Sequence, residues 1–388
     1  MKIIIIGGDG FCGWPTSLHL SKKGHDILIL DNLSRRKIDI EINTRSFTNI
    51  CSIQKRIQTW NSLNDSKIEF KLIDVAKDYH KLKTIIQEFN PDSIIHFAEQ
   101  RSAPYSMKNE DTRNYTVNNN LMATHNILNS IIEVNKNIHL VHLGSMGVYG
   151  YGTISDVIIP EGYLDVKIKN KNGQEQIMNI LHPSYPGSIY HLTKTQDALF
   201  FQYYTKNWGI KITDLHQGII WGLHTEETKL HPNLINRLDQ DSDYGTVLNR
   251  FLLQSVCNEP LTIYGTGEQT RAFIHIQNSV ECIHIAIENP PPMNDKVKIF
   301  NQMTETIQLN KLTSIIQKIY PDTTLQYIKN PRKELIKNNL EVENKQFLDL
   351  GLKPIYLRNE NFIKEIYNEL TKFKGNFKIE SLQPSSFW

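Results

Sequence analysis

The chain has 388 residues, of which 39% are hydrophobic and 22% are charged, and its formal net charge is +2. This composition is ordinary for a globular protein, and the length suggests two to three domain-sized units. The nearly balanced charge argues against a general polyanion binder, so we expect no nucleic-acid partner and only local binding of phosphate groups.

The cysteines and the apolar segments limit the cellular compartments in which this protein is expected. The four cysteines are scattered and form no CxxC pair, which is typical of a chain in a reducing compartment. The apolar run at residues 3–6 is too short for a signal peptide or a membrane span. Among the 14 histidines no HxxxH or comparable set occurs, so no catalytic metal is expected. The sequence predicts a cytoplasmic protein without a membrane partner.

The first half of the chain alternates short apolar segments with longer segments of helical pattern. The short segments are apolar almost throughout, which is typical of parallel strands buried on both faces. The alternation predicts βαβ units in a doubly wound, Rossmann-type α/β fold. Strands are expected at residues 2–6, 26–30, 70–73, 93–97 and 139–143, and helices at 11–23, 78–89, 111–134 and 188–206.

Two regions depart from this alternation. Residues 151–183 contain a Lys-Asn-Lys-Asn-Gly turn at 169–173, which predicts an inserted hairpin that forms part of the wall of a site. Beyond about residue 215, helices mix with short strands and loops. We therefore expect a Rossmann domain at 1–210 and, mainly from residues 211–388, a smaller α/β substrate-binding lobe, with the site in the crevice between them.

A glycine-rich loop follows the first predicted strand and opens the first predicted helix. Gly7, Gly10 and Gly13 have the GxxGxxG spacing, which lets backbone N–H groups approach a pyrophosphate at the positive end of a helix. The glycines alone are a weak signal, but a strand before them and a helix after them are the context that the motif needs. The loop predicts a dinucleotide cofactor, with Phe11 and Cys12 beside it.

Asp31 ends the second predicted strand, where a carboxylate can accept hydrogen bonds from the adenosine ribose. Its charge disfavours a 2′-phosphate and favours NAD over NADP, although Arg35 and Arg36 stand where arginines can bind such a phosphate. An ordinary turn with a helix-capping aspartate is the alternative. The other expected cofactor contacts are Asn32, Asp74, Val75, Phe97 and Asn120.

Tyr190 and Lys194 stand at i and i+4 of a predicted helix and share one face. In such a pair the ammonium lowers the pKa of the phenol, so the phenolate can take a proton from a sugar hydroxyl as hydride leaves for NAD. Lys194 can also hold the nicotinamide ribose. Ser145 follows the fifth predicted strand and can hydrogen-bond the same hydroxyl, which completes a Ser/Tyr/Lys set.

The spacing YxxxK occurs three times, so position has to decide between the matches. Tyr79…Lys83 follows the third predicted strand, far from the nicotinamide end of a bound cofactor, and Tyr163…Lys167 lies in the predicted hairpin. Only Tyr190…Lys194 follows the strand that ends at Gly144-Ser145. We therefore assign catalysis to that pair.

Three further side chains are candidates for the substrate side. His191 is either a second acid/base group or a packed structural histidine, and the residues leave both open. Arg271 follows a short predicted strand, and Arg332 stands beside a proline. A guanidinium fork suits a diphosphate, whereas a surface arginine paired with a carboxylate is the alternative.

Together these motifs resemble the extended short-chain dehydrogenases, which include NAD-dependent nucleotide-sugar epimerases and dehydratases. Among these, the segment HFAEQRSAPYSM at 96–107 is similar to the UDP-sulfoquinovose synthases and is far more specific than a glycine string. The resemblance runs from residue 1 to about residue 355. It also covers GGDGFCGW at 7–14, GSMGVYG at 144–150, YHLTK at 190–194, TDLHQG at 213–218, residues 225–231, GTVLNRF at 245–251 and QTR at 269–271.

The resemblance implies an enzyme of sulfolipid biosynthesis that makes UDP-sulfoquinovose. In such enzymes NAD oxidises C4 of UDP-glucose, water is lost across C5 and C6, sulfite adds at C6, and hydride returns to C4. The implied partners are UDP-glucose and sulfite, either free or delivered by another protein. The resemblance also implies a homodimer, formed through the predicted helices at 111–134 and 188–206.

The same resemblance assigns roles by position. It makes Tyr190 the base at C4 with Lys194 as its partner, and it favours His191 as the group that moves the C5 or C6 protons. Met146-Gly147 stands where 4,6-dehydratases carry an Asp-Glu pair, so Met146 is expected at the reacting centre of an enzyme that is not an ordinary dehydratase. The expected substrate contacts are Gln100, Arg101, Ser102, Gln217, Thr246, Arg250 and Gln269, with Arg271 and Arg332 at the diphosphate.

Several positions depart from this pattern. Val148 replaces an expected Glu, Ala98 an expected Gly and His216 an expected Asn, while Ser145 keeps the hydroxyl of an expected Thr. The alternative is a nucleotide-sugar 4-epimerase, or another enzyme that forms a 4-keto sugar, working without sulfite. A catalytically silent NAD-binding scaffold is a second alternative, but such proteins commonly lose the Tyr/Lys pair.

Overall fold

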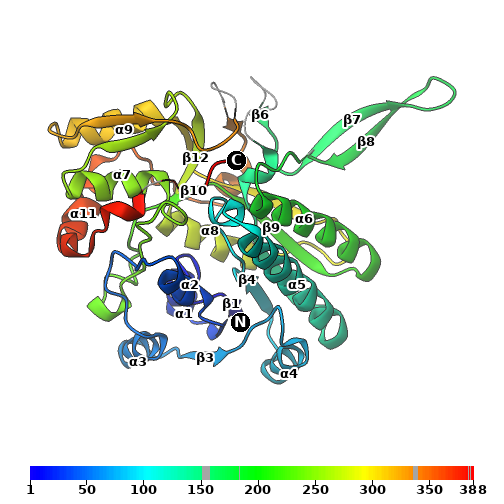
Figure 1. Ribbon diagram of the computed structural model, residues 1–388. Coiled ribbons are helices and arrows are strands. Elements are labelled where there is room, and N and C mark those ends of the chain that lie inside the picture. Colours follow the sequence, from blue (N-terminus) through cyan, green and yellow to red (C-terminus); the bar gives the residue numbers. More distant parts are fainter. Residues whose placement is uncertain (151–157, 183, 335–339, 383, 385) are drawn as a thin grey trace.

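The centre of the molecule is a parallel sheet in the order β13-β9-β5-β4-β1-β2-β3 (Figure 1). The computed structural model describes residues 1–150, 158–182, 184–334, 340–382, 384 and 386–388. The predicted Rossmann-type fold is confirmed, and the five predicted strands are present to within a residue or two. The sheet strands are β1 (Lys2–Ile6), β2 (Asp26–Asp31), β3 (Ile68–Leu72), β4 (Ser93–His96), β5 (His139–Leu143), β9 (Lys211–Gln217) and β13 (Lys298–Gln302).

Helices cover both faces of the sheet. On one face lie α1 (Gly13–Lys22), α3 (Ile53–Leu63) and α8 (Ile276–Glu288), and on the other lie α4 (Tyr79–Phe89), α5 (Glu110–Val134) and α6 (Ile189–Trp208). In β1, Ile3 and Ile5 pack into the first core, whereas Ile4 and Ile6 pack into the second. Because alternate residues of a strand point to opposite faces, a strand covered on both sides requires such an apolar run.

A second lobe packs on the carboxyl ends of these strands. It contains a three-stranded sheet, β10-β12-β14, and a two-stranded sheet, β11-β15. Its strands are β10 (Ile219–Trp221), β11 (Leu261–Tyr264), β12 (Thr270–His275), β14 (Glu305–Gln308) and β15 (Leu325–Ile328), and its helices are α7 (Val247–Val256), α9 (Leu309–Ile319), α10 (Lys345–Asp349) and α11 (Glu360–Thr371). The remaining elements are α2 (Ser34–Glu41), β6 (Ile158–Ile159), β16 (Glu341–Val342) and the short helices Tyr105–Met107, Met146–Tyr149, Pro232–Leu234, Lys374–Asn376 and Ile379–Leu382.

Two strands of the main sheet, β9 and β13, lie beyond residue 210, in the segment predicted to form mainly the substrate-binding lobe. After α6, Gly209 adopts a φ of +70° and returns the chain to the sheet, where β9 pairs with β5. Much later in the chain, β13 pairs with β9 and completes the sheet. Local patterns did not reveal this, because a parallel neighbour that is reached through a long crossover leaves no nearby signal.

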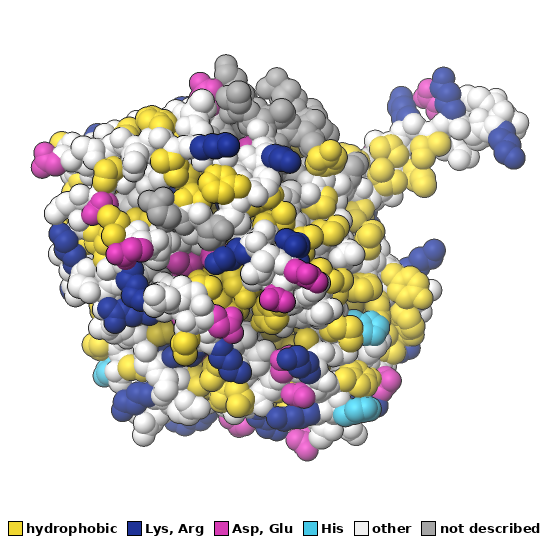
Figure 2. Space-filling model, viewed as in Figure 1, with side chains coloured by type: hydrophobic (Ala, Val, Ile, Leu, Met, Phe, Trp, Pro, Cys, Tyr) yellow, Lys and Arg dark blue, Asp and Glu magenta, His cyan; other side chains and the backbone are white. Residues whose placement is uncertain are grey.

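The predicted insertion contains a hairpin, β7 (Tyr163–Lys169) and β8 (Glu175–Leu181), while residues 151–157 of that insertion lie outside the described residues. Gly173 closes the turn with a φ of +76°. The hairpin stands off the body, with charged side chains toward its tip and hydrophobic ones nearer the body (Figure 2). No residue of β7 or β8 lines the cavity described below, so the expectation that they form its wall is wrong.

Candidate active site

A cavity of about 380 Å³ opens at the carboxyl ends of the sheet strands, with walls from both lobes. Ligands of open α/β sheets bind at this position. Arg36 and Asn120 are the two predicted site residues that are absent from its described lining. The predicted residues that line it are Gly7, Gly10, Phe11, Cys12, Gly13, Asp31, Asn32, Arg35, Asp74, Val75, Phe97, Gln100, Arg101, Ser102, Ser145, Met146, Tyr190, His191, Lys194, Gln217, Thr246, Arg250, Gln269, Arg271 and Arg332.

The loop after β1 has a shape that excludes side chains. Gly7 has a φ of +88°, and a Cβ there would lie 2.8 Å from the backbone nitrogen of Ala98. A Cβ at Gly13 would overlap the carbonyl oxygen of Gly7, so both positions require glycine. Because α1 begins at Gly13, the N–H groups of its first turn carry the positive end of the helix dipole. This cradle fits the pyrophosphate of a dinucleotide.

The two arginines that follow Asp31 are bound by carboxylates. Arg36 Nε lies 2.5 Å from Asp9 Oδ2, and Arg35 Nη2 lies 2.9 Å from Asp239 Oδ1. Asp31 accepts the N–H of Asp9 at 2.9 Å, while burial and then the Asp9 charge raise the pKa of Asp31 to about 6. Since both guanidinium groups are already paired, a 2′-phosphate would have to compete for them. This pairing favours NAD over NADP.

Tyr190 and Lys194 meet at the cavity with Ser145, which stands two residues beyond the end of β5 at Leu143. Lys194 Nζ donates a hydrogen bond to the carbonyl of Leu143 at 2.6 Å, so the end of the strand fixes the ammonium. Burial raises the pKa of the Tyr190 phenol, while the Lys194 charge and a hydrogen bond with Ser145 oppose the rise. The lysine thus acts on the phenol in the predicted direction, but burial outweighs it.

His191 is buried against the segment that follows β5. A Cβ at Gly147 would overlap the imidazole ring, so the glycine makes room for the histidine. His191 Nδ1 lies 3.0 Å from the Oγ of Ser188, the cap of α6. Burial, and then the charges of Arg332 and Arg271, lower the pKa of His191 to about 3. The side chain is therefore a neutral imidazole near pH 7, inside the cavity.

The cationic side chains of the second lobe are held in place by neighbouring groups. Arg271 forms an ion pair with Glu334, and Arg332 lines the same cavity. Arg250 donates to the hydroxyl of Tyr264 at 2.9 Å, and its guanidinium lies 4.5 Å from the centroid of that ring. These contacts fix Arg271 and Arg250 at the cavity wall beside Arg332, where the three cationic groups suit a diphosphate.

The segment Gln100–Ser102 joins the two lobes. Arg101 forms an ion pair with Asp239, and Ser102 Oγ donates to a backbone carbonyl of the second lobe at 2.5 Å. Asn120, which was predicted to contact the cofactor, is fully buried behind this segment and accepts the N–H of Gln100 at 2.8 Å. It therefore supports the wall rather than forming part of its surface.

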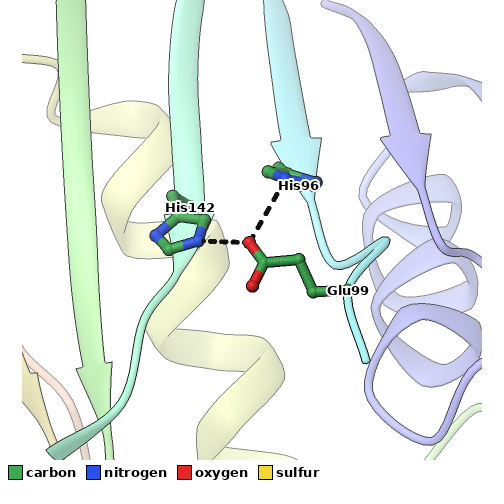
Figure 3. Close-up of side chains that lie close together, drawn as sticks. All are labelled: His96, Glu99 and His142. Carbon is green, nitrogen blue, oxygen red and sulfur yellow. Dashed lines mark hydrogen bonds and ion pairs between the residues drawn. The ribbon is translucent and has the colours of Figure 1, made fainter. Parts of the chain in front are cut away.

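A buried ionic cluster lies directly behind Lys194. Glu99 Oε1 is 2.9 Å from His142 Nε2 and 3.3 Å from His96 Nε2, and the three side chains converge (Figure 3). They lie close enough together to bind one metal ion, a set that the sequence spacing did not indicate. However, Lys194 Nζ lies 2.8 Å from Glu99 Oε2 and 3.0 Å from His142 Nε2. Because an ammonium already sits against these groups, we describe the set as an ionic cluster.

A comparison with known families decides the class of this protein. Residues 3–301 match the model of the NAD dependent epimerase/dehydratase family. The chain belongs to this family. NAD is therefore its cofactor, and the glycine cradle and Asp31 lie where the family fold holds a dinucleotide.

Relatives within the epimerase/dehydratase family confirm the resemblance seen in the motifs. The chloroplastic UDP-sulfoquinovose synthase of Spinacia oleracea is 38% identical over 391 residues, which cover 100% of this chain and 79% of that protein. The UDP-sulfoquinovose synthase of Sulfolobus acidocaldarius is 34% identical over 359 residues, covering 91% and 88%. A UDP-glucose 4-epimerase of Thermotoga maritima, solved with UDP-glucose, superimposes with a TM-score of 0.70 at 19% identity, covering 96% of this chain and 99% of that one, which confirms the fold.

Two departures from the synthase pattern lie behind the cavity of this family member. Val148 is buried in a small apolar cluster. His216 Nδ1 lies 2.6 Å from the hydroxyl of Tyr149, and His216 Nε2 lies 3.1 Å from Asp214. Neither Val148 nor His216 is among the described lining residues, whereas Ala98 is. The two larger changes therefore alter the support of the site rather than its surface.

Sequence reasoning missed the carboxylates that hold the cations of the site. They come from different elements, and no spacing along the chain connects them to their partners. Glu99 stands inside the specific segment at 96–107, which is the one signal that could have singled it out. The carboxylates are Asp9, Glu99, Asp214, Asp239 and Glu334.

Proposed function

We propose that this protein converts UDP-glucose and sulfite into UDP-sulfoquinovose and water. The observation that carries this proposal is its 38% and 34% identity to two UDP-sulfoquinovose synthases over nearly the whole chain. The meeting of Tyr190, Lys194 and Ser145 at one cavity supports it. In this reaction a C–O bond at C6 of the sugar is replaced by a C–S bond.

The first task of the site is to remove the proton from the C4 hydroxyl. Bound NAD supplies the hydride chemistry, taking a hydride from C4 and returning it at the end of the cycle. Tyr190 accepts the hydroxyl proton as a phenolate, and Ser145 hydrogen-bonds the same oxygen. The Lys194 ammonium stabilises the phenolate by its charge and holds the nicotinamide ribose.

The second task is proton transfer at C5 and C6. A ketone at C4 acidifies the C5 proton, and loss of that proton with the C6 hydroxyl eliminates water. Met146 has no ionisable group, so His191 is the acid/base group on this side of the cavity. Burial is the main cause of the low pKa of His191, and a diphosphate bound at Arg271 and Arg332 would offset the two charges that lower it further.

Sulfite adds to C6 of the unsaturated intermediate and forms the C–S bond. We place its entry at Gln100, Arg101 and Ser102, whose segment joins the two lobes at the cavity. Arg101 supplies a positive charge for the anion, although it shares that charge with Asp239. Sulfite arrives free or from a delivering protein.

Incubation with UDP-glucose, NAD and sulfite, with the product mass as the readout, tests the proposal. We expect a nucleotide-sugar heavier than UDP-glucose by the mass of SO₂, and none of it when sulfite is left out. Formation of UDP-galactose or of a free 4-keto sugar, with sulfite present and not incorporated, would contradict the synthase and establish the epimerase-type alternative.

Assembly and location extend the proposal. We propose a homodimer formed through α5 and α6, which lie side by side (Figure 1) and expose Met122, Leu199 and Tyr203. A sedimentation measurement that shows only monomer would contradict it. In the described part of the chain no helix is both long and apolar enough to cross a membrane. A cytoplasmic location stays a prediction, and the spinach relative is named as chloroplastic.

A further inference from the structure

A line of buried charged side chains begins at Lys194 and runs behind the cavity across the sheet. Lys194 Nζ lies 2.8 Å from Glu99 Oε2, on the loop after β4. Glu99 Oε1 lies 2.9 Å from His142 Nε2 on β5, and His142 Nδ1 lies 2.8 Å from Asp214 Oδ1 on β9. At the far end His216 bonds Asp214. From Glu99 to Asp214 the contacts join neighbouring strands, so the order of the strands sets the order of the charges, while His216 lies with Asp214 on β9.

These side chains are shut off from water. The side chains of Lys194, Glu99, His142 and Asp214 are 4%, 2%, 0% and 2% exposed. An isolated charge at such depth is strongly destabilising, and it persists only where an opposite charge and hydrogen bonds compensate it. The line meets this condition because cations and carboxylates alternate along it.

The direction of each pKa shift agrees with that alternation. Burial opposes ionisation of Glu99, but Lys194 and then His142 outweigh it and hold the pKa of Glu99 below its usual range. Burial likewise opposes ionisation of Asp214, and His216 and His142 outweigh it. Burial and the Lys194 charge disfavour the charged form of His142, yet Asp214 and Glu99 raise its pKa to about 9.

The other titratable groups that face the line add no compensating charge to it. On β4, burial lowers the pKa of His96 to about 3, which leaves it neutral near pH 7. On α6, burial raises the pKa of Asp197 well above its usual value, which leaves it protonated. Arg101, on the loop that carries Glu99, is already paired with Asp239. At the far end, burial and then the Asp214 charge raise the pKa of Tyr149 well above its usual value, which leaves that phenol neutral beside His216. Tyr190 lies at the cavity end of the line.

We propose that Glu99 is a positioning residue for the proposed reaction, whose carboxylate holds the Lys194 ammonium beside Tyr190 and is held in turn by His142 and Asp214. The inference rests on the proposed role of Tyr190 as the base, but not on the sulfite step. Glu99 both fixes the lysine and offsets part of its charge, so it sets how strongly the lysine stabilises the phenolate. Its effect on Tyr190 has the sign expected of a neighbouring carboxylate.

Titration of Tyr190 tests the inference without any substrate. The NAD-loaded enzyme and its Tyr190→Phe counterpart are titrated in parallel, and the difference in tyrosinate absorbance reports that one phenol. We expect Glu99→Gln to lower the midpoint by about one pH unit, because it removes a negative charge near the phenol. Glu99→Asp keeps the charge but withdraws it from Lys194, and we expect a smaller shift in the same direction.

The exposed pair Lys83–Glu133 supplies the matched control, because Glu133→Gln removes a lysine-bound carboxylate far from the cavity. Its Tyr190 midpoint should equal that of the wild type. In turnover of UDP-glucose, we expect Glu99→Gln to lower kcat at least tenfold and to move the acid limb of the pH profile to lower pH, with partial recovery in Glu99→Asp.

An unchanged Tyr190 midpoint in folded Glu99→Gln would overturn the inference. Should that variant not fold, Glu99→Asp decides alone, since a midpoint equal to that of the wild type overturns the inference as well. Failure of the proposed function looks different, because the wild type would then form no sulfonated sugar while its Tyr190 titration stayed readable.

Discussion

Two helical turns of this protein carry the same Tyr-x-x-x-Lys pattern, and each lysine is paired with a glutamate. On α6 the pair is Lys194–Glu99, with side chains 4% and 2% exposed, whereas on α4 it is Lys83–Glu133, with side chains 36% and 47% exposed. Water and salt screen the exposed charges, while the buried charges act on each other and on Tyr190 at nearly full strength. The i, i+4 spacing places a tyrosine beside a lysine in both turns, but only burial at the cavity makes their electrostatic interaction strong.

Replacing each tyrosine should give the largest contrast between the two turns. We expect Tyr190→Phe to lower turnover by about 10²–10⁴-fold, which is the range for loss of a positioned general acid/base. Tyr79 lies far from the cavity, so Tyr79→Phe should turn over at the wild-type rate. Product formation from UDP-glucose is the measurement, and substantial activity in Tyr190→Phe would remove the role assigned to that residue.

Removing the lysine charge should lower the free energy of unfolding much more in the buried pair than in the exposed pair. Lys194→Met leaves Glu99 buried without its ammonium, and loss of one partner of a buried pair costs about 3–5 kcal/mol of unfolding free energy. Lys83→Met leaves a glutamate that water can solvate, so its urea midpoint should match that of the wild type. Equal losses in the two variants would show that burial does not distinguish the pairs.

Acid should act on the buried glutamate more than on the exposed one. The pKa of Glu99 is lower in the folded than in the unfolded protein, so its stabilisation is present above the unfolded pKa of about 4.3 and is lost as the pH falls below it. We expect a flatter stability profile for Glu99→Gln than for the wild type in urea unfolding from about pH 6 to about pH 3. The hydrogen bond with Lys83 also lowers the pKa of Glu133, but water screens that exposed pair, so the profile of Glu133→Gln should stay nearly parallel to that of the wild type.

The hydroxyl at the end of β5 should show the smallest effect. Ser145 bonds the Tyr190 phenol, and its loss in Ser145→Ala should lower kcat about tenfold, as expected for one hydrogen bond of about 1.4 kcal/mol. Ser145→Thr keeps the hydroxyl and should stay close to the wild-type rate. If the two variants lost the same activity, the effect would come from packing rather than from the hydroxyl.

Local patterns were sufficient to indicate the cofactor loop and to choose Tyr190 among the three YxxxK matches as the residue that lies at the cavity. Short stretches of the sequence are enough to identify the glycines, the apolar run of β1 and the place of Tyr190 after the fifth strand. The ionic line behind Lys194 could not be identified in this way, because Glu99, His142 and Asp214 come from segments that only the strand order brings together. The same holds for Arg36, whose partner Asp9 lies on the glycine loop.

The two strands beyond residue 210 that complete the main sheet were not predicted, for a related reason. Alternating strand and helix patterns predict that a parallel sheet exists. They do not show which later strands join that sheet after a long crossover. Both β9 and β13 are such strands. For His191 the sequence indicated only a candidate acid/base group. The folded chain adds the surroundings of its ring, which lies against Gly147 and near two arginines.

The late arrival of β13 has a consequence for synthesis on the ribosome. While the chain emerges, β9 can pair with β5, but its other edge stays open until residues 298–302 have been translated. An unpaired strand edge is a template for pairing with another nascent chain. The line from Lys194 to His216 ends on β9, so Tyr190, the proposed base, receives its final surroundings only after most of the polypeptide has left the exit tunnel.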